Sequence, residues 1–203
     1  GFNGASNLSA GAGATTAIAA THFAGAVGGI VWAGIEWVKD GKPSLLGLLS
    51  GMVAGLATVT PASGFVTVGG AMIIGAAAGF FCYLAVAKLK AKLGYDDSLD
   101  AFGVHGVGST VGMLLLGVLA SGEANPAITN TFTRDGAVVS LVGSMDQLMN
   151  QAIAVVFTAV FSAVGTFVIL KVVGLITKGI RVSEDDEESG LDISEHGETA
   201  YNG

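Results

Sequence analysis

The amino-acid sequence predicts an all-α membrane protein in which five transmembrane helices cross the lipid bilayer. Composition is the first observation behind this prediction. Hydrophobic residues make up 51% of the 203 residues and charged residues only 12%, whereas soluble domains carry about 25% charged residues. The mean hydropathy is +0.68. The length of the apolar segments and the placement of lysine and arginine are the second and third observations.

Five long apolar segments lie between residues 10 and 181. A membrane-spanning helix needs about 20 residues, and each segment reaches or approaches that length. We expect the helices at 10–38, 44–61, 67–90, 99–120 and 147–177. The alternative is a set of buried helices in a large soluble protein. It is disfavoured because so few charges lie between the segments.

Lysine and arginine fall almost entirely on one side of the expected five-helix zigzag. The first connection, the third connection and the stretch after the fifth helix hold eight of the nine: Lys39, Lys42, Lys88, Lys90, Lys92, Lys171, Lys178 and Arg181. The second connection holds none and the fourth holds only Arg134. Because basic residues concentrate on the cytoplasmic side, we expect the N-terminus outside and the C-terminus inside the cell. Trp32, Trp37 and Tyr95 lie near helix ends, as in aromatic belts.

Small residues recur at intervals of four along three of the expected helices. They are Gly47, Gly51 and Gly55, then Ala71, Gly75 and Gly79, then Gly108 and Gly112. In lipid, small residues at this spacing let helix backbones approach closely. The pattern predicts a tightly packed bundle. Pro61 breaks the second helix near its outer end, where neighbouring helices or water must satisfy the freed backbone groups.

Two polar stretches complete the chain. Residues 121–145 are rich in Gly, Asn, Thr and Ser and predict an outside loop. Residues 182–203 form an acidic cytoplasmic tail with eight acids and no Lys or Arg. Its run EDDEES is typical of disorder, and the following GLDISEHGETAY is compatible with folding on a partner. The chain offers no basic surface, so we expect no nucleic-acid partner.

His105 lies at the centre of the segment DAFGVHGVGSTVGMLLLG. On an α-helix its face would carry Ala101, Phe102, Gly108, Ser109 and Gly112. Ionisable residues in spanning helices usually face the bundle interior and mark a transport path. A neutral histidine hydrogen-bonded to a carbonyl of a neighbouring helix is the alternative.

Three carboxylates, Asp96, Asp97 and Asp100, lie at the expected cytoplasmic start of the fourth helix. Capping and the helix macrodipole favour carboxylates there, so we expect a structural role for Asp97 and Asp100. Two aspartates three residues apart can also form a metal or acid–base pair. Nothing else in the sequence completes a metal site, so we expect neither a metal nor another cofactor.

The remaining candidate residues carry no clear chemistry. Cys82 lies in an apolar run, where we expect a small buried or lipid-facing side chain. His22 has no matching partner in the sequence, and we expect no function for it. His196 lies in the tail, in solvent or at a partner surface.

Several long motifs resemble the Amt/Mep/Rh family of ammonium transporters, and the tail favours the Amt branch. They are GFNGASN, GKPSLLGLLSGMVAGLATVTPASGFV, GGAMIIGAAAG, DDSLDAFGVHGVGSTVG and GLDISEHGETAY. The resemblance covers almost the whole chain and is weakest over 121–146. It implies a homotrimer of eleven-helix bundles involved in nitrogen metabolism. This chain would be a fragment, with the end of the sixth helix and an outside loop at 1–9, followed by helices seven to eleven.

The resemblance also assigns roles to single residues. His105 is similar to the second of two pore histidines, and Phe2 to one of two stacked phenylalanines at the outer gate. Ser6 is similar to the serine of the outer recruitment site, although the usual Ala-Gly before it is Gly4-Ala5 here. Ala101 resembles a pore-lining position that is often valine. The tail resembles the segment that contacts neighbouring subunits and PII-type nitrogen-regulatory proteins.

The resemblance implies a transporter that moves ammonium or ammonia through an apolar, histidine-lined pore after deprotonation. An ammonium sensor that signals through the tail is the alternative from another class. An intramembrane enzyme using Asp97, Asp100 and His105 would need a nucleophile or metal set on a facing helix, which the sequence lacks. We therefore expect no enzymatic activity.

Overall fold

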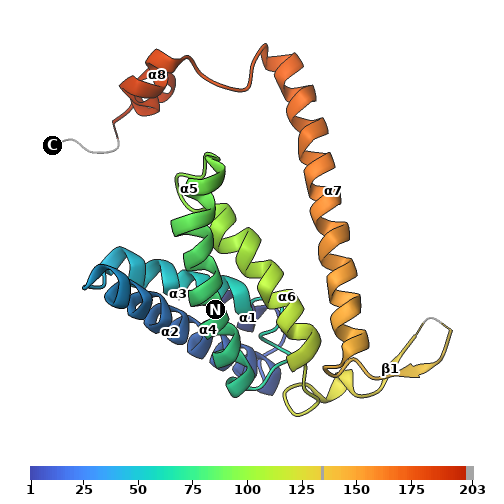
Figure 1. Ribbon diagram of the computed structural model, residues 1–203. Coiled ribbons are helices and arrows are strands. Elements are labelled where there is room, and N and C mark those ends of the chain that lie inside the picture. Colours follow the sequence, from blue (N-terminus) through green and yellow to red (C-terminus); the bar gives the residue numbers. More distant parts are fainter. Residues whose placement is uncertain (134, 200–203) are drawn as a thin grey trace. The chain divides into compact units, whose positions relative to one another are not determined.

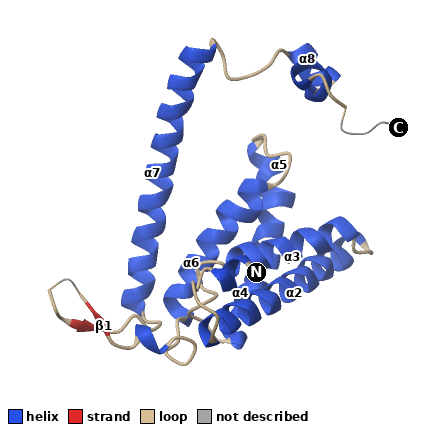
Figure 2. Cartoon of the chain, turned by 180° about the vertical axis from the view of Figure 1, so that it is seen from behind, coloured by secondary structure: helices blue, strands red, loops and turns tan. Residues whose placement is uncertain are grey.

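The computed structural model describes residues 1–133 and 135–199, apart from the side chain of Phe132. Helices dominate it (Figure 1 and Figure 2). The chain divides into two compact units, Gly1–Val155 and Val156–Gly203. Arg134 and the last four residues of the expected tail lie outside the described residues.

The first unit consists of helices that follow the expected apolar segments within a few residues. They are α1 (Phe2–Ala5), α2 (Ala12–Asp40), α3 (Leu45–Val59), α4 (Val68–Leu84), the π-helical turn η1 (Ala85–Leu89), α5 (Lys90–Leu93), the π-helical turn η2 (Phe102–Gly106), α6 (Val107–Leu119), the 3₁₀ turn η3 (Pro126–Ile128) and the start of α7 (Met145–Thr177). The turn η1 joins α4 to α5 without a break, and η2 leads directly into α6. The all-α class is therefore confirmed.

Four helices in the described part of the chain are long and apolar enough to cross a membrane. They are Ala12–Asp40, Val68–Leu93, Phe102–Leu119 and Met145–Thr177. The expected segment 44–61 forms a shorter helix, since α3 has 15 residues and ends at Val59. The chain then turns through Pro61, whose ring cannot continue a helix without losing a hydrogen bond.

Short polar side chains set the starts of α3 and α4. Ser44 Oγ accepts a hydrogen bond from the Gly47 N–H at 2.9 Å, and Thr67 Oγ1 accepts one from the Gly70 N–H at 3.2 Å. Each satisfies an amide that has no partner within its own helix. Gly41 ends α2 with φ +78°, a left-handed conformation that glycine adopts without steric cost.

The connections alternate between the two ends of this unit. After α3, the Phe65 carbonyl accepts a hydrogen bond from the Ser121 N–H at 2.8 Å, and the Gly64 carbonyl accepts one from Asn125 Nδ2 at 3.3 Å. The loop after α6 therefore supplies partners to two carbonyls of the connection between α3 and α4. At the opposite end Lys39 Nζ donates to Tyr83 Oη at 3.1 Å and so joins the ends of α2 and α4. This alternation agrees with the expected zigzag.

Backbone contacts between α2 and its neighbours form the centre of the packing. A Cβ atom added to Gly55 of α3 or to Gly75 of α4 would overlap the Ala24 carbonyl oxygen of α2. Gly79 of α4 faces the carbonyl oxygen of Gly28, one turn further along α2, in the same way. The close packing predicted from the glycine spacing is confirmed.

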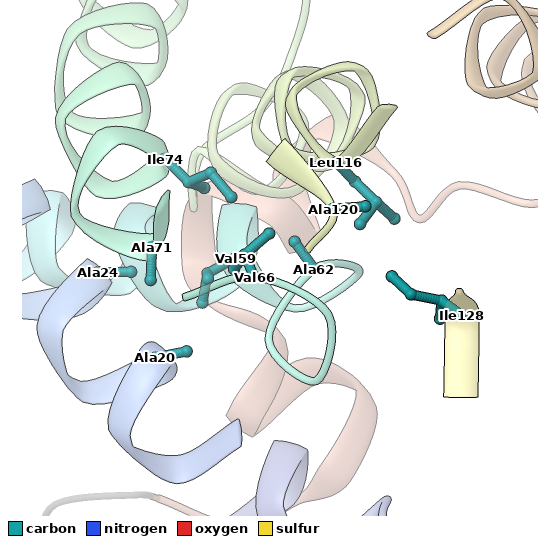
Figure 3. Close-up of a cluster of buried hydrophobic side chains, with 10 residues drawn as sticks. All are labelled: Ala20, Ala24, Val59, Ala62, Val66, Ala71, Ile74, Leu116, Ala120 and Ile128. Carbon is teal, nitrogen blue, oxygen red and sulfur yellow. The ribbon is translucent and has the colours of Figure 1, made fainter. Parts of the chain in front are cut away.

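Apolar side chains fill the space around these contacts in two clusters. Figure 3 shows the first, in which Val59 and Val66 lie between α2 and α4 on one side and Leu116 and Ala120 on the other. The second contains Trp32, Cys82 and Tyr83. Trp32 does not face outward as a residue of an aromatic belt would, because it is only 4% exposed and its Nε1 donates to Glu36 at 3.2 Å.

A small β-hairpin interrupts the loop that follows α6. Strand β1 (Thr131–Phe132) pairs antiparallel with β2 (Val138–Val139). The Thr133 N–H donates to the Ala137 carbonyl at 2.8 Å, and Gly136 adopts φ +80°. The segment expected as an outside loop thus contains a hairpin, which β-branched residues on either side of an Asp-Gly pair favour.

The second unit begins within α7, none of whose residues is buried. It continues with α8 (Glu184–Ser189) and the π-helical turn η4 (Asp192–His196). The EDDEES run was expected to be disordered but forms α8. Ser183 Oγ accepts from the Asp186 N–H at 3.2 Å, and Arg181 pairs with Glu187 at 3.0 Å. Carboxylates in the first turn also interact favourably with the helix dipole.

Two glycines of α2 provide a matched test of the packing. A Cβ at Gly28 would lie 2.5 Å from the Gly51 carbonyl oxygen of α3, whereas a Cβ at Gly34 would meet no atom within 4 Å. We expect Gly28→Ala to lower the free energy of unfolding by about 1–3 kcal/mol through overpacking. Gly34→Ala should be neutral or stabilising by up to about 1 kcal/mol, because alanine favours helix. Thermal unfolding of the purified protein in detergent measures both, and equal midpoints would contradict the packing described.

Candidate functional site

His105 lies in the π-helical turn η2 rather than in a regular α-helix. The Val107 N–H donates to the Phe102 carbonyl, five residues earlier, which is the hydrogen bond that defines the turn. Single π turns inside helices occur frequently at functional sites. The turn leaves the His105 side chain exposed and open to a cavity.

The cavity beside His105 has a volume of about 380 Å³. Besides His105 and Ser109 it is lined by Gly1, Phe2, Asn3, Thr21, Val53, Leu56, Ala57 and Thr60. Phe2 and Asn3 come from α1, and Val53, Leu56 and Ala57 come from α3. The structure therefore brings Phe2 and His105, which are 103 residues apart in the sequence, to one cavity. We call it the histidine cavity.

A second, larger cavity of about 570 Å³ is also lined by Phe2. It contains Ser6, together with polar residues of α2 and of the loops around Gly64 and Glu123. Phe2, Asn3 and Thr60 line both cavities. Ser6 and His105 thus belong to two neighbouring spaces that share these three residues as part of their walls. We call this second space the serine cavity.

Asn3 holds the short helix α1 against the rest of the unit. Its Nδ2 donates to Thr21 Oγ1 on α2 at 3.0 Å and to Thr60 Oγ1 after α3 at 3.3 Å. Sequence reasoning assigned no role to Asn3. The threonine hydroxyls in otherwise apolar segments are the signal that could have pointed to a polar partner, because each can still accept a hydrogen bond after donating to a carbonyl of its own helix.

Ser6 ends α1, and its Oγ donates to the Phe2 carbonyl at 2.9 Å. This bond uses the single proton of the hydroxyl and leaves its lone pairs free to accept from a cation that carries N–H groups. The bond therefore holds the Ser6 hydroxyl, in the serine cavity, one helical turn from Phe2, which lines both cavities.

Ala101 is the residue that the structure does not bring to either cavity. It precedes η2 and is exposed. Gly108 and Gly112, expected on the same face as His105, are buried, and an added Cβ at either would meet Thr58 of α3. Ser109 does share the histidine cavity. The π turn has more residues per turn than an α-helix, so the α-helical spacing does not describe this face.

The carboxylates before η2 bind to backbone amides and to a lysine. Asp97 Oδ2 accepts from the N–H groups of Phe102 and Gly103 at 3.0 and 3.3 Å. Asp100 pairs with Lys90 at 2.7 Å, and Asp96 is exposed. In the described part of the chain, no group of three or more His, Cys, Asp or Glu side chains is arranged to hold a metal ion.

The other histidines and the cysteine lie apart from both cavities. His22 is exposed on α2 and contacts the ring of Phe23 edge-on, with centroids 5.8 Å apart. His196 is exposed in η4. Cys82 is fully buried, and its thiol lies 3.8 Å from the Val104 carbonyl oxygen.

Comparison with known proteins gives a consistent result. The sequence model of the ammonium transporter family matches residues 1–201. Ammonium transporter Amt1 of Archaeoglobus fulgidus is 43% identical over 202 residues, which cover 99% of this chain and 48% of the relative. The crystal structure of Saccharomyces cerevisiae Mep2 superimposes with a TM-score of 0.78 at 33% identity, over 91% of this chain and 40% of that one.

A solved structure of a sensor Amt protein also superimposes, with a TM-score of 0.80 at 26% identity over 96% of this chain and 45% of that one. The chain spans about half the length of the curated relatives it matches. The apolar helices, the two cavities and a family match over nearly the whole chain lead to one conclusion. This membrane protein belongs to the ammonium transporter family.

Proposed function

We propose that this chain forms one wall of an ammonium path across the membrane, with protein outside these 203 residues forming the other wall. The observation that carries the proposal is the pair of cavities that share Phe2, one containing Ser6 and the other His105. Ammonium enters the serine cavity, and the neutral amine moves past Phe2 into the histidine cavity after deprotonation.

Relative energies favour passage of the neutral species. Moving an ammonium-sized ion from water into an apolar medium costs on the order of 20 kcal/mol in the idealised limit. Removing its proton at pH 7 costs about 5 kcal/mol if its pKa is near the 10.4 of an alkylammonium. A narrow apolar path therefore passes the amine and leaves the proton to be carried separately.

The residues at each step have the chemistry that the step requires. The Ser6 hydroxyl accepts a hydrogen bond from ammonium, and the face of the Phe2 ring attracts a cation. The His105 imidazole can accept a hydrogen bond from the amine at one nitrogen and relay a proton through its ring. Ala101 remains a proposed pore-lining residue, supported by its place one residue before η2.

Orientation and assembly follow from charge and exposure. The lysines at the α2–α3 connection and near η1 and α5 lie at one end of the first unit, which we propose to be cytoplasmic. The N-terminus is then outside and the acidic tail inside. We also propose that α7, with no residue buried in the chain, contacts lipid or neighbouring subunits of a homotrimer. The tail then meets a PII-type regulatory protein.

An ammonium sensor is the second candidate function, and the similarity to a sensor Amt protein favours including it. The same cavities would bind the ligand, and the tail would transmit the signal. Transport and sensing differ in one measurable property, since only transport accumulates ammonium-derived nitrogen in sealed vesicles.

Replacement of His105 tests the path. In the complete transporter, reconstituted in proteoliposomes, we expect His105→Ala to reduce ammonium transport at least about 10-fold, in the range of lost proton-transfer catalysis. It should also admit potassium, because water can enter the space left by the ring and solvate a cation. His22→Ala is the matched control and should leave both currents unchanged. If His105→Ala and His22→Ala carried equal currents that were still specific for ammonium, His105 would be a residue that only packs.

Replacement of Ser6 tests recruitment. We expect Ser6→Ala to raise the apparent KM for ammonium about 5-fold, the equivalent of roughly 1 kcal/mol for one hydrogen bond, without changing the maximal rate. Ser9→Ala is the control, because Ser9 lies in the loop after α1 outside both cavities. Concentration series of transport by both variants give the two constants. An unchanged KM in Ser6→Ala would remove Ser6 from the recruitment step.

A further inference from the structure

The π-helical turn that carries His105 is held by contacts at its start. Asp97 Oδ2 accepts hydrogen bonds from the N–H groups of Phe102 and Gly103, the first two residues of the turn. These two amides lack partners within the helix that follows. The carboxylate of Asp97 therefore acts as the cap of η2 and fixes where the turn begins.

Asp100, between the cap and the turn, adopts an unusual backbone conformation. Its φ is +55°, in the left-handed region that few residues other than glycine enter. Its carbonyl accepts from the Val104 N–H at 2.9 Å, and its own N–H donates to the Asp97 carbonyl at 3.1 Å. A strained residue persists only where its surroundings determine it, so a stabilising contact at Asp100 is required.

Lys90 supplies that contact and joins it to the cap. Its Nζ lies 2.7 Å from Asp100 Oδ1 and 2.5 Å from the Asp97 carbonyl oxygen. The side chains of Lys90 and Asp100 are 30% and 31% exposed, so water reaches the pair only in part. The ammonium group of Lys90 thus binds both Asp97 and Asp100, the two aspartates that precede η2.

Lys90 is brought there by a second π-helical turn. It follows η1 directly, and η1 packs against η2 at Val86 and Gly103. A Cβ added to Gly103 would lie 2.7 Å from Val86 Cγ2, so the two turns are in close contact. The ion pair joins the residue after η1 to the residues before η2.

We infer that Lys90 is a positioning residue for the transport proposed above, acting through His105. By holding Asp97 and Asp100 it keeps η2 in its π-helical register and directs the imidazole into the histidine cavity. Lys90 does not line the histidine cavity or the serine cavity. The inference rests on the proposed function, because it concerns the orientation of the proposed pore histidine.

The test uses the complete transporter in proteoliposomes and compares Lys90→Gln with Lys92→Gln. Lys92 is exposed, two residues further along α5, and forms no ion pair among the described residues. We expect Lys90→Gln to lower the maximal rate about 10-fold at unchanged apparent KM, since small misplacements of a working group cost up to about 100-fold. Lys90→Gln should also raise the ratio of potassium current to ammonium current. Lys90→Arg should restore both the maximal rate and this ratio, and Lys92→Gln should match the wild type in both.

Two further variants separate positioning from folding. Asp100→Asn removes the same ion pair from its other side and should reproduce the raised current ratio. When Lys90→Gln is combined with His105→Ala, the current ratio should equal that of His105→Ala alone. The current ratio does not depend on how much protein folds.

A Lys90→Gln ratio equal to that of Lys92→Gln would overturn the positioning role. The positioning role would also be overturned if adding Lys90→Gln to His105→Ala changed the current ratio further. Absence of ammonium transport by the wild type would instead contradict the proposed function, and the role of Lys90 with it.

Discussion

The close approach of α2 to α3 and α4 is the constraint on which the rest of the first unit depends. The Ala24 carbonyl oxygen of α2 faces Gly55 of α3 and Gly75 of α4, and the Gly28 carbonyl oxygen faces Gly51 and Gly79. In lipid, helices gain little hydrophobic free energy by associating, so contact between backbones must stabilise the bundle. A side chain larger than glycine at these positions would separate the helices that carry the site.

The site is assembled on this packed core from short polar contacts. Asn3 joins α1 to Thr21 of α2 and to Thr60 after α3, so the position of Phe2 depends on the distance between those helices. On the other side of the histidine cavity, Asp97 and Lys90 fix the turn that carries His105. The two aromatic rings of the proposed path therefore belong to different elements, each tied to the bundle by its own hydrogen bonds.

Hydrophobicity and glycine spacing were sufficient to predict the helices and their tight packing, because lipid demands long apolar segments and small interfacial residues. The π turns η1 and η2 were not predictable, since no periodicity signals one inserted residue within a helix. As a result, Gly108 and Gly112 were expected beside His105 but are buried against Thr58. The role of Asn3 was missed because its partners are distant in the sequence. Helix α8 was missed because the acidic composition indicated disorder more strongly than the capping residue Ser183 indicated a helix.

We propose that the ammonium path runs through the histidine cavity, and chemical modification of Ser109 tests this most directly. Ser109 lines the cavity, whereas the adjacent Thr110 does not. Ser109→Cys and Thr110→Cys would be made in the complete transporter with Cys82 replaced by alanine, then treated with methyl methanethiosulfonate. Modification of Ser109→Cys should block ammonium transport, ammonium should slow this modification, and Thr110→Cys should stay active. Full labelling of Ser109→Cys with undiminished transport would contradict the proposal.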